Sequence, residues 1–93
     1  MSATFSWSVA TPEGTAASGE CQFLVVPTSG GELGVLADHA ASVASVVPGE
    51  LRVTSGGQTR SVSVGGGVVE VRDNRVRLLV SGAGGDQQTT VRR

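Results

Sequence analysis

The chain has 93 residues, with seven arginines, eight acidic residues, one histidine and a formal net charge of −1. This length predicts a single domain whose core is just large enough to fold without disulfides or a structural metal. The near-neutral charge excludes a molecule-wide field that would attract nucleic acid or an acidic membrane. Only three residues are aromatic, so the sequence also lacks the interleaved basic and aromatic side chains of a nucleic-acid surface.

Alternating apolar and polar side chains near the N-terminus predict a half-buried strand, with Phe5, Trp7 and Val9 facing the core. The TPEG segment that follows predicts a turn. The next run, ECQFLVVP, is more continuously apolar and predicts a strand that is covered on both faces and stopped by Pro27. Within it, the lone Cys21 is interpreted as a small buried hydrophobe, not a nucleophile, and its solitary occurrence fits a reducing compartment.

The segment GGELGVLADHA, residues 30–40, is too rich in glycine for a helix and too broken for a long strand, so it predicts an ordered loop. Its apolar side chains are expected to anchor the loop to the core, and its polar side chains are then left outward. The expected anchors are Leu33, Val35 and Leu36, and the outward residues are Glu32, Asp38 and His39. A phosphate cradle, a catalytic site and a docking surface are the three candidate roles.

The second half of the chain predicts strands joined by tight turns. ASVASVV, residues 41–47, favours a strand, with a short helix as the alternative. The Gly-Gly pair at 56–57 and the Asp-Asn pair at 73–74 each separate two alternating runs, as in hairpins. The three glycines at 65–67 indicate a bulge or a close backbone approach. The alternation places these side chains on one inward face: Leu51, Val53, Val62, Val64, Val69, Val71, Val76, Leu78 and Val80.

Together these signals predict an all-β fold of about eight to ten short strands, as a β-sandwich or a flattened barrel. Residues 82–93 lose the alternation and are expected to be a frayed tail. The N-terminus has no signal-peptide pattern, and no apolar run approaches the roughly 20 residues that span a bilayer. We therefore expect a soluble protein.

These residues fit a phosphate-binding loop, a metal site and a serine nucleophile poorly. TSGGELG lacks the Lys-Ser/Thr pair of a P-loop, and one histidine with one cysteine offers no metal-ligand spacing. A nucleophile at Ser42 or Ser45 would need His39 as its base. Adjacent residues of an extended chain point to opposite faces, so Asp38 is poorly placed to orient His39. A plain polar loop is the simplest interpretation of these residues, a docking surface is the functional alternative, and an enzyme is disfavoured.

The order of several motifs resembles one known family. VVPTSGGELGVLADHA is followed by PGELRV and then by GGGVVEVRDNRVRLL, while TPEG and Ser18-Gly19-Glu20 fit the same order ahead of them. Over about residues 5–81 the chain is similar to the epsilon subunit of the F-type ATP synthase. The resemblance implies a flattened β-sandwich of about ten short strands in two sheets, in agreement with the strand count reached from alternation.

The resemblance also implies how the chain is divided. Residues 1–81 correspond to the epsilon-type β-sandwich domain, and residues 82–93 are expected to be a flexible C-terminal tail. Typical members continue into a two-helix C-terminal hairpin that in some of them blocks hydrolysis or binds ATP. No C-terminal helical domain is expected here, so neither inhibition nor ATP sensing is expected to carry over.

The function implied by the resemblance is that of a non-catalytic central-stalk, or rotor, subunit. Family members link the gamma shaft to the membrane ring of c subunits, so that ion translocation is coupled to ATP synthesis in other subunits. The expected partners are the gamma subunit and the c-ring, with no catalytic residue, cofactor, metal, nucleic acid or small-molecule substrate. The expected location is the cytoplasmic face of an energy-transducing membrane, peripheral through the complex. The alternative is a stand-alone β-sandwich module that binds another protein.

Individual contacts can be carried over only where the motif matches. In the family, the GELG…HA segment faces the polar loops of the ring. The matching positions, whose implied role is contact with the c-ring, are Gly31, Glu32, Leu33, Gly34 and His39. Among them, Glu32 is the expected partner for basic ring side chains. The gamma-subunit contact is assigned to Ala41 and Ser42, where the family often has a proline and a large apolar residue.

Overall fold

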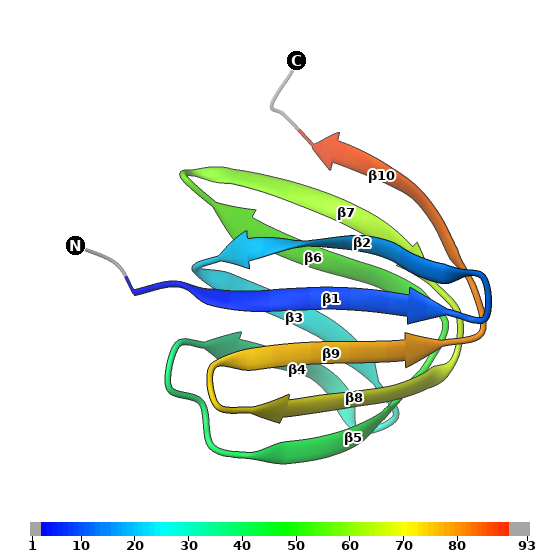
Figure 1. The fold of residues 1–93 in the computed structure, drawn as a ribbon, viewed down its shortest axis with the longest axis horizontal. Coiled ribbons are helices and arrows are strands. Elements are labelled where there is room, and N and C mark those ends of the chain that lie inside the picture. The colour runs from blue at the N-terminus through cyan, green and yellow to red at the C-terminus, as the bar shows by residue number, and fades with distance from the viewer. Residues whose placement is uncertain (1–2, 90–93) are drawn as a thin grey trace.

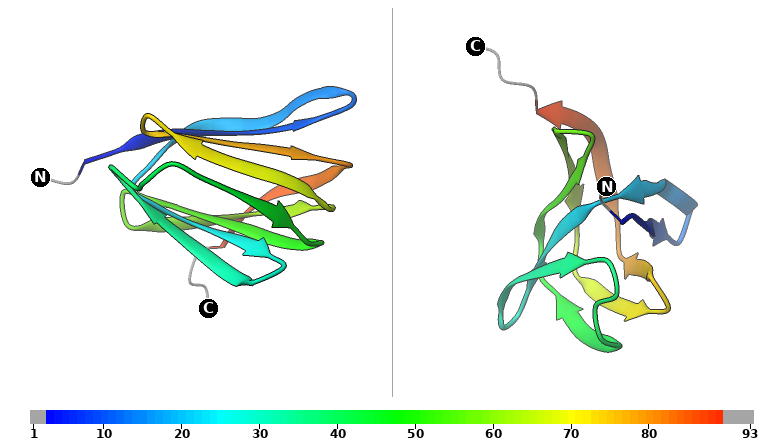
Figure 2. Two further views of the ribbon diagram at one scale, coloured as in Figure 1. Left: turned by 90° about the horizontal axis from the view of Figure 1, so that it is seen from below. Right: turned by 90° about the vertical axis from the view of Figure 1, so that its left-hand side faces the viewer.

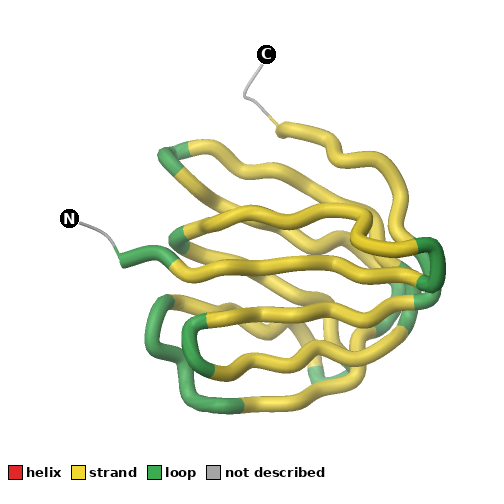
Figure 3. Tube along the Cα trace, in the orientation of Figure 1, coloured by secondary structure: helices red, strands yellow, loops and turns green. Residues whose placement is uncertain are grey.

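The computed structural model describes residues 3–89, and Figure 3 shows that they form strands joined by short loops. None of these residues forms a helix, so none belongs to a long apolar helix of the kind that crosses a membrane. The strands are β1 (Phe5–Thr11), β2 (Gly14–Cys21), β3 (Phe23–Thr28), β4 (Gly31–Leu36), β5 (Ser42–Val46), β6 (Gly49–Ser55), β7 (Gln58–Val64), β8 (Gly67–Arg72), β9 (Arg75–Val80) and β10 (Ala83–Thr89). The all-β prediction is confirmed.

The strands form two layers that face each other across one core. One layer has the order β10-β7-β6-β3, with β4 paired to the other edge of β3, and the second has the order β5-β8-β9-β1-β2. Strands of the two layers pair where Thr28 of β3 faces Val46 of β5. Figure 1 shows the second layer in front of the first, and Figure 2 shows both layers edge-on. The architecture is therefore a flattened sandwich that approaches a barrel.

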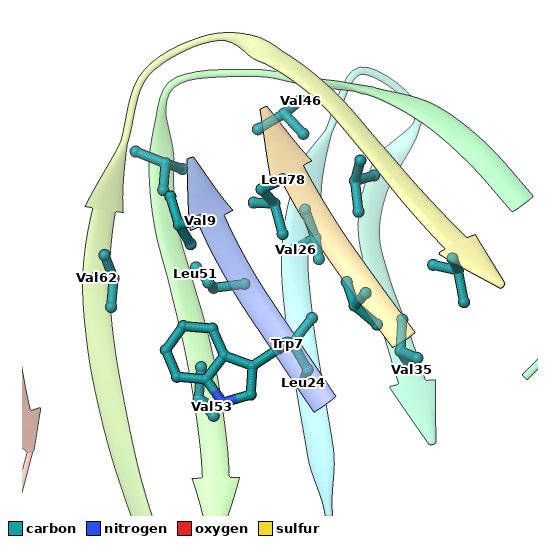
Figure 4. Packing of buried hydrophobic residues seen from close by; sticks show 14 of the residues in the cluster. Trp7, Val9, Leu24, Val26, Val35, Val46, Leu51, Val53, Val62 and Leu78 are labelled. Carbon is teal, nitrogen blue, oxygen red and sulfur yellow. The ribbon is translucent and has the colours of Figure 1, made fainter. Parts of the chain in front are cut away.

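Strict alternation along the strands builds the core. Phe5, Trp7 and Val9 of β1 are all buried, as predicted. Every apolar residue assigned to the inward face between residues 51 and 80 is also buried. In Figure 4 side chains from both layers meet in this core around Trp7. Period-two alternation succeeds here because one face of each layer packs against the other layer while the opposite face meets solvent.

The apolar run at residues 20–27 is not the single strand, covered on both faces and stopped by Pro27, that the sequence predicted. It is broken at Gln22 into the end of β2 and the start of β3, and β3 continues through Pro27 to Thr28. Only one face of β3 is covered, because Leu24 and Val26 are buried while Phe23 remains 38% exposed. Pro27 lies outside the stretch of β3, Phe23–Val25, that pairs with β6, so its missing N–H removes no hydrogen bond from that ladder. Its carbonyl still accepts a hydrogen bond from Val47 N–H at 3.1 Å.

The turn predictions are confirmed by backbone conformation. Gly56 and Gly57 have φ values of 60° and 79°, and Asp73 and Asn74 have values of 52° and 57°. Both central residues of each turn are thus left-handed, as a two-residue hairpin with matched twist requires. The segment 41–47 contains β5 and no helix, which confirms the favoured reading.

The glycine run at 65–67 marks a close approach of two backbones. A Cβ added to Gly67 would lie 2.0 Å from the carbonyl oxygen of Leu79. Gly67 begins β8 and faces Val80 of β9, so only a residue without a side chain fits there.

The C-terminal segment is more ordered than a frayed tail. Ala83–Thr89 form β10, which pairs antiparallel with β7 and has an irregular register between Ala83 and Asp86. Backbone groups along the edge of β7 form this pairing, which needs no alternation of apolar side chains. Residues 90–93 of the expected tail lie outside the described residues. The division of the chain between residues 81 and 82 remains a prediction.

Candidate docking surface

The segment expected to be a loop contains a strand. Gly31–Leu36 form β4, which pairs with β3 residue for residue, and the turn between them lies at Ser29 and Gly30. The loop is confined to residues 37–41. An edge strand is held mainly by its ladder of backbone hydrogen bonds, so few apolar side chains suffice.

The predicted anchors follow the alternation of β4. Val35 is buried and Leu33 is half-buried against the core, as expected. Leu36 is 61% exposed, so its assignment as an anchor is wrong. Successive side chains of a strand point to opposite faces, and Leu36 therefore faces outward beside Phe23, its neighbour on β3.

Two glycines of β4 have specific structural roles. Gly31 has a φ of 110° and follows the turn, where its carbonyl accepts a hydrogen bond from the Thr28 hydroxyl. Gly34 lies against the aromatic ring of Phe23, because an added Cβ would be 3.3 Å from the ring. These glycines therefore shape the outer surface of the β3–β4 hairpin.

Glu32 points outward from β4 and already has a basic partner within the chain. Its carboxylate accepts a hydrogen bond from the Arg52 guanidinium of β6 at 3.0 Å, across the outer face of β3. The side chains of Glu32 and Arg52 are 65% and 46% exposed. Sequence reasoning did not identify Arg52 as a site residue.

The loop from Ala37 to Ala41 holds the histidine at the other end of β4. His39 is half-buried, its backbone N–H donates to Leu36 O at 3.2 Å, and its ring Nδ1–H donates to Ala40 O at 2.8 Å. Ser42 also donates its hydroxyl to Ala40 O, at 3.1 Å. The hydroxyl of Ser42 is thus directed at a carbonyl and not at the imidazole, which is the wrong arrangement for a serine nucleophile and its base.

Asp38 is joined to Asn74 and not to the histidine. Its backbone N–H donates to Asn74 Oδ1 at 2.6 Å, and its own Oδ1 accepts from Asn74 Nδ2 at 3.0 Å. The structure therefore agrees with the expectation that Asp38 does not orient His39. An open groove of about 840 Å³ lies between this loop and the β8–β9 hairpin, and its lining includes Asp38, His39, Ala41, Ser42 and Asn74.

The sequence-assigned contact residues fall at two ends of the sandwich. Gly31 and Glu32 lie beside the β3–β4 turn, whereas His39, Ala41 and Ser42 lie beyond the far end of β4. In Figure 1, β4 lies behind β8 and β9, and the loop that follows it lies on the left, near the β8–β9 turn. At about 3.3 Å per residue, the strand separates the two groups by about 20 Å. The structure thus does not bring all the assigned ring-contact residues into one patch.

Three exposed apolar side chains on the outer face of the second layer were missed. Val43, Val68 and Leu79 are 72%, 43% and 51% exposed. Val68 and Leu79 are cross-strand neighbours on β8 and β9, and Val43 follows the assigned residues Ala41 and Ser42. The signal in the sequence was the presence of apolar residues at outward positions of the alternation.

The remaining titratable groups do not form a metal site. Within residues 3–89, no three His, Cys, Asp or Glu side chains are arranged to hold a metal ion. Cys21 is fully buried, as predicted, and burial raises the pKa of its thiol to about 11. Its thiolate is therefore scarce at neutral pH.

Together these features define a class of protein: a β-sandwich domain whose described residues form ten strands, with an ion pair on the outer face of one layer and exposed apolar side chains on the outer face of the other. The family model for the β-sandwich domain of the ATP synthase delta/epsilon chain matches residues 4–84. The chain belongs to this family.

Curated relatives and solved structures agree with this assignment. The ATP synthase epsilon chain of Desulfitobacterium hafniense is 39% identical over 83 residues, covering 89% of this chain and 63% of the relative. That of Desulforamulus reducens is 39% identical over 93 residues, covering 100% of this chain and 70% of the relative. A chain of the Euglena gracilis mitochondrial ATP synthase OSCP/F1/c-ring structure superposes with a TM-score of 0.77 at 26% identity, covering 84% of this chain and 51% of that one. This chain therefore spans about half to two thirds of the length of these proteins.

Proposed function

We propose that this protein is a non-catalytic central-stalk subunit of an F-type ATP synthase. In this role it links the gamma shaft to the c-ring, so that ion translocation is coupled to ATP synthesis in other subunits. The observation that carries the proposal is the family match over residues 4–84, which covers nearly the whole sandwich. The likeness to a chain from a structure containing F1 and a c-ring supports the same role.

The proposed location follows from the proposed partners. The relatives are subunits of the ATP synthase, which is a membrane-associated complex. We place this chain at the cytoplasmic face of the membrane, held there by the gamma subunit and the c-ring.

The β3–β4 hairpin is the proposed ring contact. It presents Gly31, Glu32, Leu33 and Gly34 from a strand that is paired along its whole length, so the backbone is ordered before binding. Ordering in advance lowers the entropy cost of association. Glu32 offers a solvent-exposed carboxylate to basic side chains of the ring, with Arg52 as its partner in the free chain.

The opposite end of the sandwich is the proposed gamma contact. Ala41 and Ser42, assigned to gamma from the sequence, lie beside His39 and at the start of β5. We therefore assign His39 to the gamma side, because β4 separates it from Glu32. The exposed Val43 extends the same surface with an apolar side chain, as the centre of a protein interface generally requires.

Affinity purification from native membranes tests the proposed function. A tagged copy of this chain should recover both gamma and the c-ring. In binding assays with each partner purified separately, Glu32→Arg should weaken binding to the c-ring while keeping gamma binding, and the matched charge reversal Glu20→Arg, on the other layer, should leave both unchanged. Recovery of neither partner by the unmodified chain would contradict the proposal and favour a stand-alone binding module.

A further inference from the structure

Asn74 connects three segments that are far apart in the sequence. Its side chain exchanges two hydrogen bonds with Asp38, 36 residues away, through the Asp38 backbone N–H and the Asp38 carboxylate. Its backbone carbonyl accepts from Ser6 N–H at 3.1 Å. The β8–β9 turn thereby joins the start of β1 to the loop between β4 and β5. Figure 3 shows that loop and the β8–β9 turn at the same end of the molecule.

Few other contacts hold the loop at residues 37–41 in place. Among the described residues, its remaining hydrogen bonds join residues no more than three positions apart, such as His39 N–H to Leu36 O. Ala37 packs against the core, whereas Asp38, Ala40 and Ala41 are exposed, so packing holds the loop mainly at its first residue. The side chain of Asn74 is thus the long-range restraint on the segment that carries His39 and Ala41.

Both residues of the pair have conformations that restrict which side chains fit. Asp38 has a φ of 64° and Asn74 a φ of 57°, in the left-handed region. Asparagine and aspartate occupy this region more readily than other residues with a side chain. Each is therefore suited both to its backbone position and to the reciprocal hydrogen bonds.

We propose that Asn74 is a positioning residue for partner binding: it holds the loop at residues 38–41 in the conformation that the gamma subunit contacts. This role rests on the proposed function above. A loop that is already fixed loses less conformational entropy when a partner binds, so Asn74 contributes to affinity without being part of the contact.

The first test compares two glycine substitutions in the same turn. Asn74→Gly removes both side-chain hydrogen bonds and suits the left-handed backbone. Asp73→Gly is the matched control, because Asp73 has a φ of 52° and makes only an exposed 3.6 Å ion pair with Arg72. The measurement is hydrogen exchange at the backbone amide of Asp38. Asn74→Gly should speed exchange about tenfold, and Asp73→Gly should leave it within about twofold.

The second test is rescue by exchange of the two side chains. Asn74→Asp places one carboxylate against another, so it should also speed exchange at residue 38. The double variant Asp38→Asn/Asn74→Asp restores the pair with donor and acceptor reversed, and should return exchange to the unmodified rate. Non-specific destabilisation of the turn would not be rescued in this way.

Binding to the purified gamma–c-ring complex completes the test. Asn74→Gly should weaken binding about three- to tenfold, with Asp73→Gly unchanged and the double variant restored. Unchanged exchange in Asn74→Gly, or faster exchange with unchanged affinity, would overturn the positioning role. Failure of the unmodified chain to bind would instead overturn the proposed function, so the two failures are distinguishable.

Discussion

Glu32 and Arg52 show how a charged contact is prepared at the scale of single residues. They lie on the two strands that flank β3, and their 3.0 Å ion pair is exposed. Such pairs contribute about 0–1 kcal/mol to the free energy of unfolding. The pair therefore adds little to stability, and its more important effect is to fix the direction of the Glu32 carboxylate.

A charge exchange separates the effect of this ion pair on stability from its effect on ring binding. Glu32→Arg should lower the free energy of unfolding by about 1 kcal/mol or less, and should weaken ring binding about tenfold at low salt. Adding Arg52→Glu should restore stability but not ring binding, because the charge presented to the ring stays reversed. Denaturant titration and binding at two salt concentrations measure both effects. Recovery of ring binding in the double variant would contradict the assigned contact.

Cys21 gives a pH dependence with a defined sign. Burial raises the pKa of its thiol from 9.0 to about 11, so above pH 9 the unfolded chain loses this proton before the folded chain does. The contribution of Cys21 to stability is thus fully present below pH 9 and is lost as pH rises to 11, with a total of about 2–3 kcal/mol. Cys21→Ala should remove this slope. Parallel denaturation curves for both proteins at pH 8 and pH 10.5 would show whether the slope belongs to Cys21.

At the scale of elements, local turns and long-range ladders act together. The β6–β7 and β8–β9 hairpins are set by residues that accept left-handed backbone conformations. The β3–β4 hairpin and β10 depend instead on available partners, namely the edges of β3 and β7. The surface proposed for docking lies mostly on elements of the second kind.

The contact between β8 and β9 at Gly67 should be intolerant of any side chain. Gly67→Ala would bring a Cβ against the backbone of Leu79, where relief requires the strands to separate. We expect a loss of about 3 kcal/mol or more in the free energy of unfolding. Gly30→Ala is the control, because an added Cβ there meets nothing within 4 Å. Equal melting temperatures for the two variants would contradict this account.

At the scale of the whole molecule, the question is whether one small domain can hold two partners. The accessible surface is 5203 Å², and a standard interface covers about 800 Å² of each partner. Two interfaces would cover about a third of the surface. The two proposed contacts lie at opposite ends of β4, so they do not compete for the same residues.

If the two partners bind at opposite ends of β4, two separate regions of the chain should be protected from amide exchange. In the complex with gamma and the c-ring, amide exchange should slow at residues 29–34 and at residues 37–43. A complex with gamma alone should protect only the second region. Hydrogen exchange with mass spectrometry resolves these peptides. Protection of residues 29–34 by gamma alone would contradict the separation of the two surfaces.

The sequence by itself determined the strands with strict alternation and the turns between them. Val69 and Val71, for example, are buried because period two places them on one face, and the Asp-Asn turn follows from the conformations those residues accept. These are local properties, so a local pattern predicts them.

Only the tertiary structure decided where β4 and β10 pair, that Leu36 faces outward, and which side chains meet across the surface. Glu32 reaches Arg52 across a third strand, and Asp38 reaches Asn74 across 36 residues. Neither pair has a signal in the sequence, because each depends on the order and register of strands that are distant along the chain. The division of the expected contact residues between two ends has the same origin, since an extended strand separates residues that the sequence places close together.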